Sequence, residues 1–208
     1  HGVSTNLAVK IYKEYGDTSL QVVQENPYQL ERDIYGIGFK TADRIAQALG
    51  LSPEHPSRIE AGIVFALNET INQGHVYVPN GMLVQRAIEL LEVSHELFQP
   101  GLERLEGQER VRQEKLPRPN GRDDEIMDVV YLTPLYWGEV GVAERIKALA
   151  KAQAPLLLQE KLPETGIDLS DEQGQAVKMA LAHPVSILTG GPGTGKTTCL
   201  KALIATLD

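Results

Sequence analysis

A chain of 208 residues, 42% of them hydrophobic, has room for one large or two small domains with buried cores. The formal net charge of -8 excludes a protein that holds nucleic acid by its overall charge, so any such contact must be local. The lone cysteine, Cys199, excludes an internal disulfide framework, and no apolar run has membrane length, so we expect a cytoplasmic protein without membrane contact.

The first 50 residues contain an internal repeat with an offset of 34 residues. Residues 2–11 align with residues 36–45, and both copies continue to a glycine, Gly16 or Gly50. Each copy predicts a tight turn, a helix with apolar residues at helical spacing, and a glycine C-cap. Between the copies, residues 18–25 predict a short amphipathic helix that ends before a proline.

A glycine hairpin between two short helices resembles the helix-hairpin-helix module, and the repeat resembles a tandem pair of them. The backbone N–H groups of Gly36 and Gly38 would bind DNA phosphates without reading sequence, and Lys40 and Arg44, one turn apart, would reinforce that contact. Two other interpretations stay open: an ordinary four-helix cluster with glycine turns, or hairpins that are structural and do not touch DNA. The first copy has Ser4 in place of the second glycine, which makes it the weaker phosphate binder.

The middle of the chain reads as helix, short strand, helix, helix and two further strands, which is the order of a winged-helix domain. Ser57, Asn80 and Ser94 each precede an apolar-periodic run and are the expected N-caps. The expected helices run over residues 57–73, 80–92 and 94–106, and the expected strands over 74–79, 110–115 and 129–132.

A basic stretch interrupts this acidic region. Residues 51–165 carry 12 Lys and Arg against 18 Asp and Glu, but residues 110–122 carry five basic side chains and a single acid. Arg112, Lys115 and Arg118 of this expected wing are candidate DNA contacts. A protein-interaction surface and a solvated charge run on a hairpin are the alternatives.

Residues 134–151 predict a further helix with apolar residues at helical spacing. Tyr136 and Trp137 near its start are suited to stacking a base, although an aromatic pair on an amphipathic helix is more often part of a core. Residues 155–163 are the expected approach to the next domain.

Gln173, near the start of a helix expected to end at about residue 182, fits two roles. With Ser170 it matches a capping box, which contributes about 1 kcal/mol. The segment also resembles the one that precedes the P-loop in superfamily-1 helicases, where a glutamine recognises adenine. Gln173 stands 17 residues before Gly190, and this position favours the adenine role.

Residues 190–197 read GGPGTGKT and fit the phosphate-binding pattern G-x-x-x-x-G-K-[ST]. An apolar, strand-like run at 185–188 precedes the loop, and a helix is expected after it. In this arrangement backbone N–H groups turn toward the phosphates, Lys196 neutralises the β- and γ-phosphates and Thr197 ligates Mg²⁺. Lys196 and Thr197 are thus the catalytic candidates, and ATP with Mg²⁺ is the expected ligand. The expected nucleotide contacts are Gln173, Gly190, Gly191, Gly193, Thr194, Gly195, Lys196, Thr197 and Thr198.

Cys199 follows in the first turn of that helix. A thiol there can have a lowered pKa, but a small buried packing residue is the simpler interpretation.

Together, GIGFKTAD at residues 36–43, LS-x-EQ at 169–173 and TGGPGTGKTT at 189–198 resemble the RecD-like superfamily-1 helicases. The match looks closest to the branch that acts without RecB and RecC. The resemblance implies a mainly α chain with a tandem helix-hairpin-helix at 1–52 and a winged-helix-like α+β domain at 53–152. Residues 153–208 would hold a linker and the first β-P-loop-α unit of an α/β RecA-like motor domain.

The resemblance also implies an ATP-dependent DNA helicase that uses Mg²⁺, moves 5′→3′ on single-stranded DNA and acts on forked DNA. The 208 residues contain no acidic motif after the P-loop, no arginine finger and no second motor lobe, so we expect no measurable ATP hydrolysis by them alone. The alternative is a DNA-binding or partner-docking module of a P-loop ATPase in DNA repair that is not a helicase. The acidic middle region is the candidate surface for a protein partner, and the sequence leaves open whether one docks there.

Overall fold

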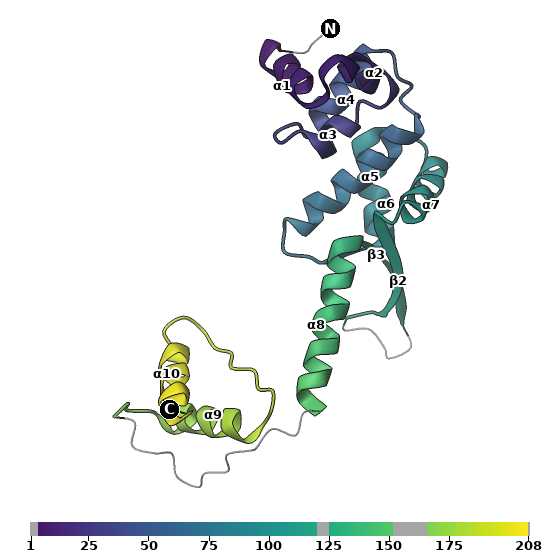
Figure 1. The fold of residues 1–208 in the computed structure, drawn as a ribbon. Coiled ribbons are helices and arrows are strands. Elements are labelled where there is room, and N and C mark those ends of the chain that lie inside the picture. Colours follow the sequence, from purple (N-terminus) through teal and green to yellow (C-terminus); the bar gives the residue numbers. More distant parts are fainter. Residues whose placement is uncertain (1–3, 120–124, 152–165, 208) are drawn as a thin grey trace. The chain divides into compact units, whose positions relative to one another are not determined.

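The computed structural model describes residues 4–119, 125–151 and 166–207 (Figure 1). They divide into two compact units, His1–Trp137 and Gly138–Asp208. Helices dominate the described residues and a small three-stranded sheet completes them, so the predicted mainly α class is confirmed. None of the helices in these ranges is long and apolar enough to cross a membrane.

The N-terminal repeat folds into short helices. Ser4 caps the first of them by accepting a hydrogen bond from the Leu7 N–H, at 3.3 Å, and Gly16 ends it with φ at 56°. The repeat therefore places helices α1 and α4 at equivalent positions, 34 residues apart at their first residues. The sequence analysis missed α3, which has only five residues. The elements are α1 (Thr5–Tyr15), η1 (Gly16–Thr18), α2 (Ser19–Glu25), α3 (Gln29–Asp33) and α4 (Phe39–Ala48).

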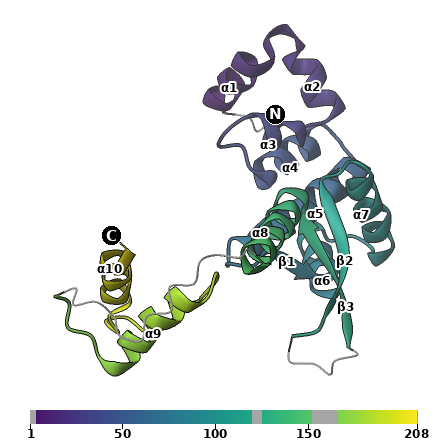
Figure 2. The same cartoon turned by 60° about the horizontal axis from the view of Figure 1, so that its bottom comes forward.

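The following elements have the winged-helix order that the sequence predicts. Strand β3 lies between β1 and β2 and pairs antiparallel with both, and β2 and β3 form the long ribbon in Figure 2. The tip of that ribbon, with Arg122, lies outside the described residues. The elements are α5 (Pro56–Ile71), β1 (Tyr77–Pro79), α6 (Asn80–Leu91), η2 (His95–Leu97), α7 (Phe98–Gly107), β2 (Val111–Pro117) and β3 (Ile126–Leu132).

Two of the expected helix caps in this region are wrong. His55, not Ser57, caps α5, because Pro56 occupies the first helical position and the His55 ring accepts the Ser57 N–H at 3.3 Å. Asn80 is the first residue of α6 rather than its cap, and its buried Oδ1 has no hydrogen-bond partner among the described residues. Ser94 does act as a cap, since it accepts the Glu96 N–H of η2 at 3.4 Å.

Helix α4 joins the repeat to the winged region because it is buried on two sides. Phe39, Ala42 and Ala46 belong to the large hydrophobic cluster formed mainly by α5, α6, α7 and the sheet. Ile45 belongs instead to a smaller cluster with Ile37 and other side chains of the repeat. Helix α4 is therefore held between two cores, and Ile37 anchors the hairpin before it to the smaller one.

A buried ion pair strengthens the same junction. Arg58 of α5 donates from Nε to Asp43 of α4 at 2.8 Å, and the Tyr28 hydroxyl donates to the same carboxylate at 2.6 Å. Arg58 also donates to the carbonyl oxygens of Pro53 and Leu91, each at 2.9 Å. Burial and the Asp43 carboxylate raise the pKa of Tyr28 well above its ordinary value. The network ties α4 and α5 to the end of α6.

Helix α8 (Thr133–Lys151) begins in the first unit and continues into the second. In the second unit, α9 (Asp171–Ala182) and α10 (Lys196–Leu207) pack through Val177, Leu181, Cys199 and Ala202. Cys199 is only 4% exposed, which confirms its packing role. The expected approach at 155–163 lies outside the described residues.

The expected strand at 185–188 does not form within the described residues. A strand needs a hydrogen-bonded neighbour, and no described segment pairs with this one. Ile187 is consequently 81% exposed, although its sequence context is that of a buried strand.

Candidate functional site

The backbone of the P-loop contacts the side chain of the loop's own lysine, Lys196. Lys196 is the first residue of α10, and its ammonium group donates to the carbonyl oxygens of Gly190, at 2.8 Å, and Gly191, at 2.6 Å. The Thr194 hydroxyl donates to the Gly191 carbonyl at 2.9 Å and closes the loop. The free N–H groups of a helix N-terminus favour an anion, so the loop places a cation and a helix end together. Thr197, the predicted Mg²⁺ ligand, is exposed in the first turn of α10.

Two loop positions require glycine for conformational reasons. Gly193 has φ at 76° and Gly195 has φ at 82°, in the left-handed region that side chains disfavour. At Gly195 a Cβ atom would also lie 2.2 Å from the amide nitrogen of Gln173. The helix before the P-loop thus fits closely against the loop.

Gln173 performs its capping role and touches the loop at the same time. The Ser170 hydroxyl accepts the Gln173 N–H at 3.3 Å, and the Gln173 Oε1 accepts the Ser170 N–H at 3.1 Å, so the capping box is confirmed. The Gln173 Nε2 donates to the carbonyl oxygen of Thr194 at 3.3 Å. The second predicted role, recognition of adenine, stays a prediction.

The glycine hairpin before α4 presents free backbone donors. Gly36, with φ at 87°, and Gly38, the uncapped N-cap of α4, are both exposed, whereas Ile37 between them is only 3% exposed. Within the described residues neither glycine N–H donates a hydrogen bond to another protein group. The buried isoleucine fixes the turn, and the free N–H groups belong to exposed residues on either side of it. Gly2 of the first hairpin lies outside the described residues.

Lys10 of the first repeat lies against the second hairpin. Its ammonium group donates to the Tyr35 carbonyl at 3.3 Å, and a Cβ atom at Gly36 would lie 3.3 Å from its nitrogen. The sequence analysis missed this residue as a site candidate. The repeat contained the signal, because its offset aligns Lys10 with Arg44.

The two predicted cations of α4 differ in their surroundings. The Lys40 ammonium lies 5.8 Å from the centre of the Phe65 ring on α5, a cation–π contact. Arg44 is exposed and has no ion pair among the described residues. Lys40 therefore contributes in part to packing, whereas the Arg44 side chain is exposed and can contact a ligand.

The three predicted wing cations do not share one face. Arg112 and Lys115 are three positions apart on β2, and side chains alternate along a strand, so they lie on opposite faces of the sheet. Arg118 follows the strand and pairs loosely with Glu125, at 3.9 Å. The wing is a less concentrated cation site than its sequence indicates.

Arg112 lies beside an exposed aromatic ring. Its guanidinium is 5.8 Å from the centre of the Trp137 ring, and Trp137 is 54% exposed. The Tyr136 ring meets Trp137 edge-on and also contacts buried Tyr131. The core interpretation of Trp137 is therefore wrong, since more than half of its side chain is exposed.

Comparison with known proteins identifies both ends of the chain. A family model described as the ATP-dependent RecD2 DNA helicase HHH domain matches residues 1–77, and one described as an AAA domain matches residues 173–208. Over 97% of its length the chain is 28% identical to the ATP-dependent RecD2 DNA helicase of Deinococcus radiodurans, of which it covers 29%. The chain is therefore similar to RecD-like helicases at both ends, and to one of them along nearly its whole length.

RecD subunits of the RecBCD enzyme match a shorter part of this RecD-like chain. It is 36% identical to RecD of Mycolicibacterium smegmatis over 38% of the chain and 14% of that subunit. It is 38% identical to RecD of Mycobacterium tuberculosis over 37% of the chain and 13% of that subunit. The RecD-like chain thus spans less than a third of the length of the curated relatives it matches.

The described residues of the RecD-like chain contain no cluster of three or more His, Cys, Asp or Glu side chains that could hold a metal ion. A P-loop holds Mg²⁺ differently, between its Ser or Thr hydroxyl and the nucleotide phosphates. Thr197, exposed beside Lys196, fits that arrangement. The bound ion would neutralise phosphate charge.

Proposed function

We propose that this RecD-like chain supplies the DNA-binding hairpins and the P-loop of an ATP-dependent DNA helicase that moves 5′→3′ on single-stranded DNA. The observation that carries the proposal is the combination of two phosphate-directed surfaces in one chain. One is the loop that surrounds the Lys196 ammonium, and the other is the hairpin with free N–H groups at Gly36 and Gly38. The family supports the assignment to DNA helicases.

The P-loop residues would exchange contacts within the protein for contacts with ATP. Lys196 would leave the carbonyl oxygens of Gly190 and Gly191 for the β- and γ-phosphates, and Thr197 would hold Mg²⁺. Gln173 would present its amide to adenine after release of the Thr194 carbonyl. Since the Oε1 of Gln173 also accepts the Ser170 N–H, full use of the amide would weaken the capping box, at a cost of about 1 kcal/mol.

The hairpin would hold the DNA backbone. The N–H groups of Gly36 and Gly38 and the first turn of α4 offer donors without base selectivity, and Lys10 adds a cation beside them. The wing would add Lys115 and Arg118, and Trp137 with Arg112 would stack an unpaired base. Single-stranded or forked DNA is therefore the proposed substrate.

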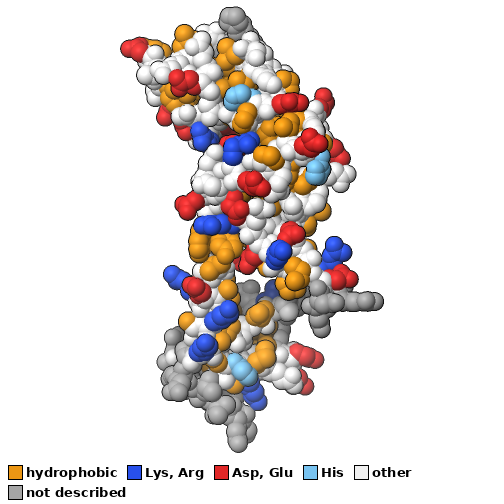
Figure 3. All heavy atoms as spheres, turned by 90° about the vertical axis from the view of Figure 1, so that its right-hand side faces the viewer, with side chains coloured by type: hydrophobic (Ala, Val, Ile, Leu, Met, Phe, Trp, Pro, Cys, Tyr) orange, Lys and Arg blue, Asp and Glu red, His pale blue; other side chains and the backbone are white. Residues whose placement is uncertain are grey.

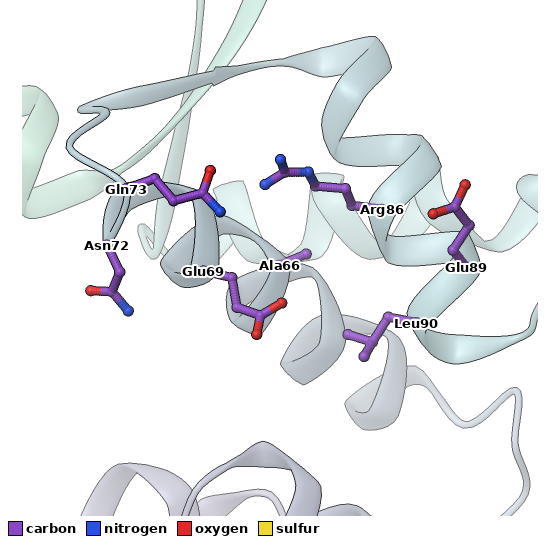
Figure 4. Close-up of a pocket in the computed structure, with 7 residues that line it drawn as sticks. All are labelled: Ala66, Glu69, Asn72, Gln73, Arg86, Glu89 and Leu90. Atoms are coloured by element: carbon purple, nitrogen blue, oxygen red, sulfur yellow. The ribbon is translucent and has the colours of Figure 1, made fainter.

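A second candidate function is a partner-docking module whose ATPase is not a helicase. The observation that favours it is a hollow of about 550 Å³ between α5 and α6, lined by Ala66, Glu69, Asn72, Gln73, Arg86, Glu89 and Leu90 (Figure 4). In Figure 4 the Arg86 guanidinium extends toward α5, where it donates to the Thr70 hydroxyl. Acidic side chains are spread among basic and hydrophobic ones on the face in Figure 3, as a protein-binding surface would allow.

Unwinding by the whole protein that contains this chain tests the proposal. Duplexes with a single 5′ or a single 3′ tail are incubated with ATP and Mg²⁺, with Lys196→Ala as the matched control. We expect unwinding of the 5′-tailed duplex only, and none with the variant. DNA-stimulated ATP hydrolysis without strand separation would favour the second function instead.

A further inference from the structure

A polar hollow lies where the N-terminal repeat meets the winged region. It measures about 190 Å³, several times the roughly 30 Å³ that a water molecule occupies in the liquid. The repeat contributes Asn26 and Arg32 to its lining, and the winged region contributes Ser57, Glu60, Gln108 and Arg110. Both parts belong to the first compact unit.

Two guanidinium groups in this hollow have no bound acceptor. Arg110 is half-buried, and its side chain makes no hydrogen bond or ion pair within the described part of the chain. The same is true of the exposed side chain of Arg32. Burial, followed by repulsion from Arg32, lowers the pKa of Arg110. Each guanidinium group has five N–H donors, and two like charges close together favour an anion between them.

The nearby carboxylates do not neutralise Arg32 and Arg110. Glu60 is already engaged, because Arg104 donates to one of its oxygens at 2.7 Å and Gln108 donates to the other at 3.1 Å. Glu31 lies close enough to be stabilised by Arg110 and Arg32, but burial outweighs them and raises the pKa of its carboxyl group. Three arginines, Arg32, Arg104 and Arg110, face two glutamates, which leaves one positive charge.

The hollow between α5 and α6 has the opposite balance. Glu69 and Glu89 line it together with a single cation, Arg86. The two hollows are thus distinguished by charge, and only the one at the junction is suited to an anion.

We propose that Arg32 and Arg110 bind a phosphate group in this junction hollow. Guanidinium groups match phosphate oxygens in pairs of parallel hydrogen bonds, and Asn26 and Ser57 offer further polar contacts on its wall. Because Arg32 comes from α3 and Arg110 immediately precedes β2, one phosphate would link the repeat to the winged region. The proposal does not depend on helicase activity. The bound phosphate group is either a phosphodiester of DNA or a free phosphate ion.

The 208-residue chain with Lys196→Ala, which removes the phosphate site of the P-loop, is the background for the test. Two variants are made in this background. One is the double variant Arg32→Gln, Arg110→Gln, and the other is the matched control Arg145→Gln, at an exposed position of α8. Melting temperature is measured with inorganic phosphate against sodium chloride at equal ionic strength. We expect phosphate to raise the melting temperature of the background and of the control, but not of the double variant. Circular dichroism without phosphate checks that each variant is folded.

A second measurement identifies the source of the phosphate. Binding of a fluorescent single-stranded and a duplex oligonucleotide is followed over a range of salt concentrations. If DNA supplies the phosphate, the double variant binds at least about threefold more weakly, and its log–log salt slope is smaller by roughly 0.7 to 0.9. If DNA binding is unchanged while the phosphate-dependent stabilisation is lost, the ligand is a free phosphate. Equal behaviour of the double variant and the background in both measurements overturns the proposal.

Discussion

The amide nitrogen of Gln173 donates a hydrogen bond to the carbonyl oxygen of Thr194, 3.3 Å away, and so connects the N-terminus of α9 to the P-loop. The same side chain closes the capping box with Ser170. One glutamine therefore links the end of a helix to a phosphate-binding loop, and a conformational change in the loop would alter the hydrogen bonds that cap the helix.

Replacing this glutamine separates its two roles. Gln173→Glu keeps an oxygen that can accept the Ser170 N–H, but loses the amide that would recognise adenine. Gln173→Ala loses both, and we expect it alone to destabilise α9, by about 1 kcal/mol in urea unfolding. Both variants should lose the preference for fluorescent ATP over fluorescent GTP. Retention of that preference in both would contradict the adenine role.

Gly195→Ala is expected to abolish most nucleotide binding. The residue has φ at 82°, and the added Cβ would lie 2.2 Å from the Gln173 amide nitrogen. Strain of about 1–3 kcal/mol predicts a loss of roughly five- to 150-fold in the affinity for fluorescent ATP. Gly174→Ala is the control, because a Cβ atom there meets no atom within 4 Å. An unaffected Gly195→Ala variant would show that the loop adapts.

Lys10 should contribute to DNA binding although it lies in the other repeat. Its ammonium lies beside the hairpin carbonyl of Tyr35, whereas Lys13 on the same helix is exposed and makes no hydrogen bond or ion pair among the described residues. Lys10→Gln is expected to weaken binding of single-stranded DNA roughly two- to fivefold, or about 0.5–1 kcal/mol, and Lys13→Gln less. Equal effects of the two changes would mean that only overall charge matters.

The hairpin should matter more than the wing. Gly36→Val combined with Gly38→Val removes the left-handed turn at Gly36 and covers both exposed donors. We expect this pair to weaken DNA binding more than Arg118→Ala, since Arg118 is exposed and already pairs with Glu125. Anisotropy titrations of the two folded variants decide the order. The reverse order would place the main contact on the wing.

Asp43→Ala should strongly destabilise the first unit. It would leave Arg58, with a side chain only 9% exposed, without its carboxylate and would remove the acceptor of the Tyr28 hydroxyl. Loss of one partner of a buried pair costs about 3–5 kcal/mol, measurable in urea unfolding. Gln47→Ala, which removes an exposed hydrogen bond to the same carboxylate, is expected to cost far less. Similar costs for the two changes would show that the pair is dispensable.

The fold was predictable where a local pattern decides it. The glycine turns, the capping box at Ser170 and the helix–strand order of the winged region follow from spacing and turn chemistry. The cap of α5 did not follow from the local pattern, because the His55 ring caps the helix in place of Ser57. The prediction of a strand at 185–188 was also wrong, since strand pairing depends on a neighbouring strand and not on the segment itself.

Long-range contacts limited the prediction of the sites. The junction hollow joins Arg32 to Arg110, 78 positions later by their numbers, and no local pattern brings these side chains together. The same limit hid the contact of Lys10 with the second hairpin. The P-loop was the opposite case, because its function resides in eight consecutive residues.

Binding of the 208-residue chain to DNA at several salt concentrations tests the central claim most directly. Fluorescent single-stranded, duplex and forked oligonucleotides are titrated with the chain and with the Gly36→Val, Gly38→Val variant. We predict binding at low salt, with a log–log slope of roughly -0.7 to -0.9 for each phosphate neutralised, and a marked loss in the variant. No binding of the folded chain to any of the three at low salt would contradict the claim that its hairpins contact DNA.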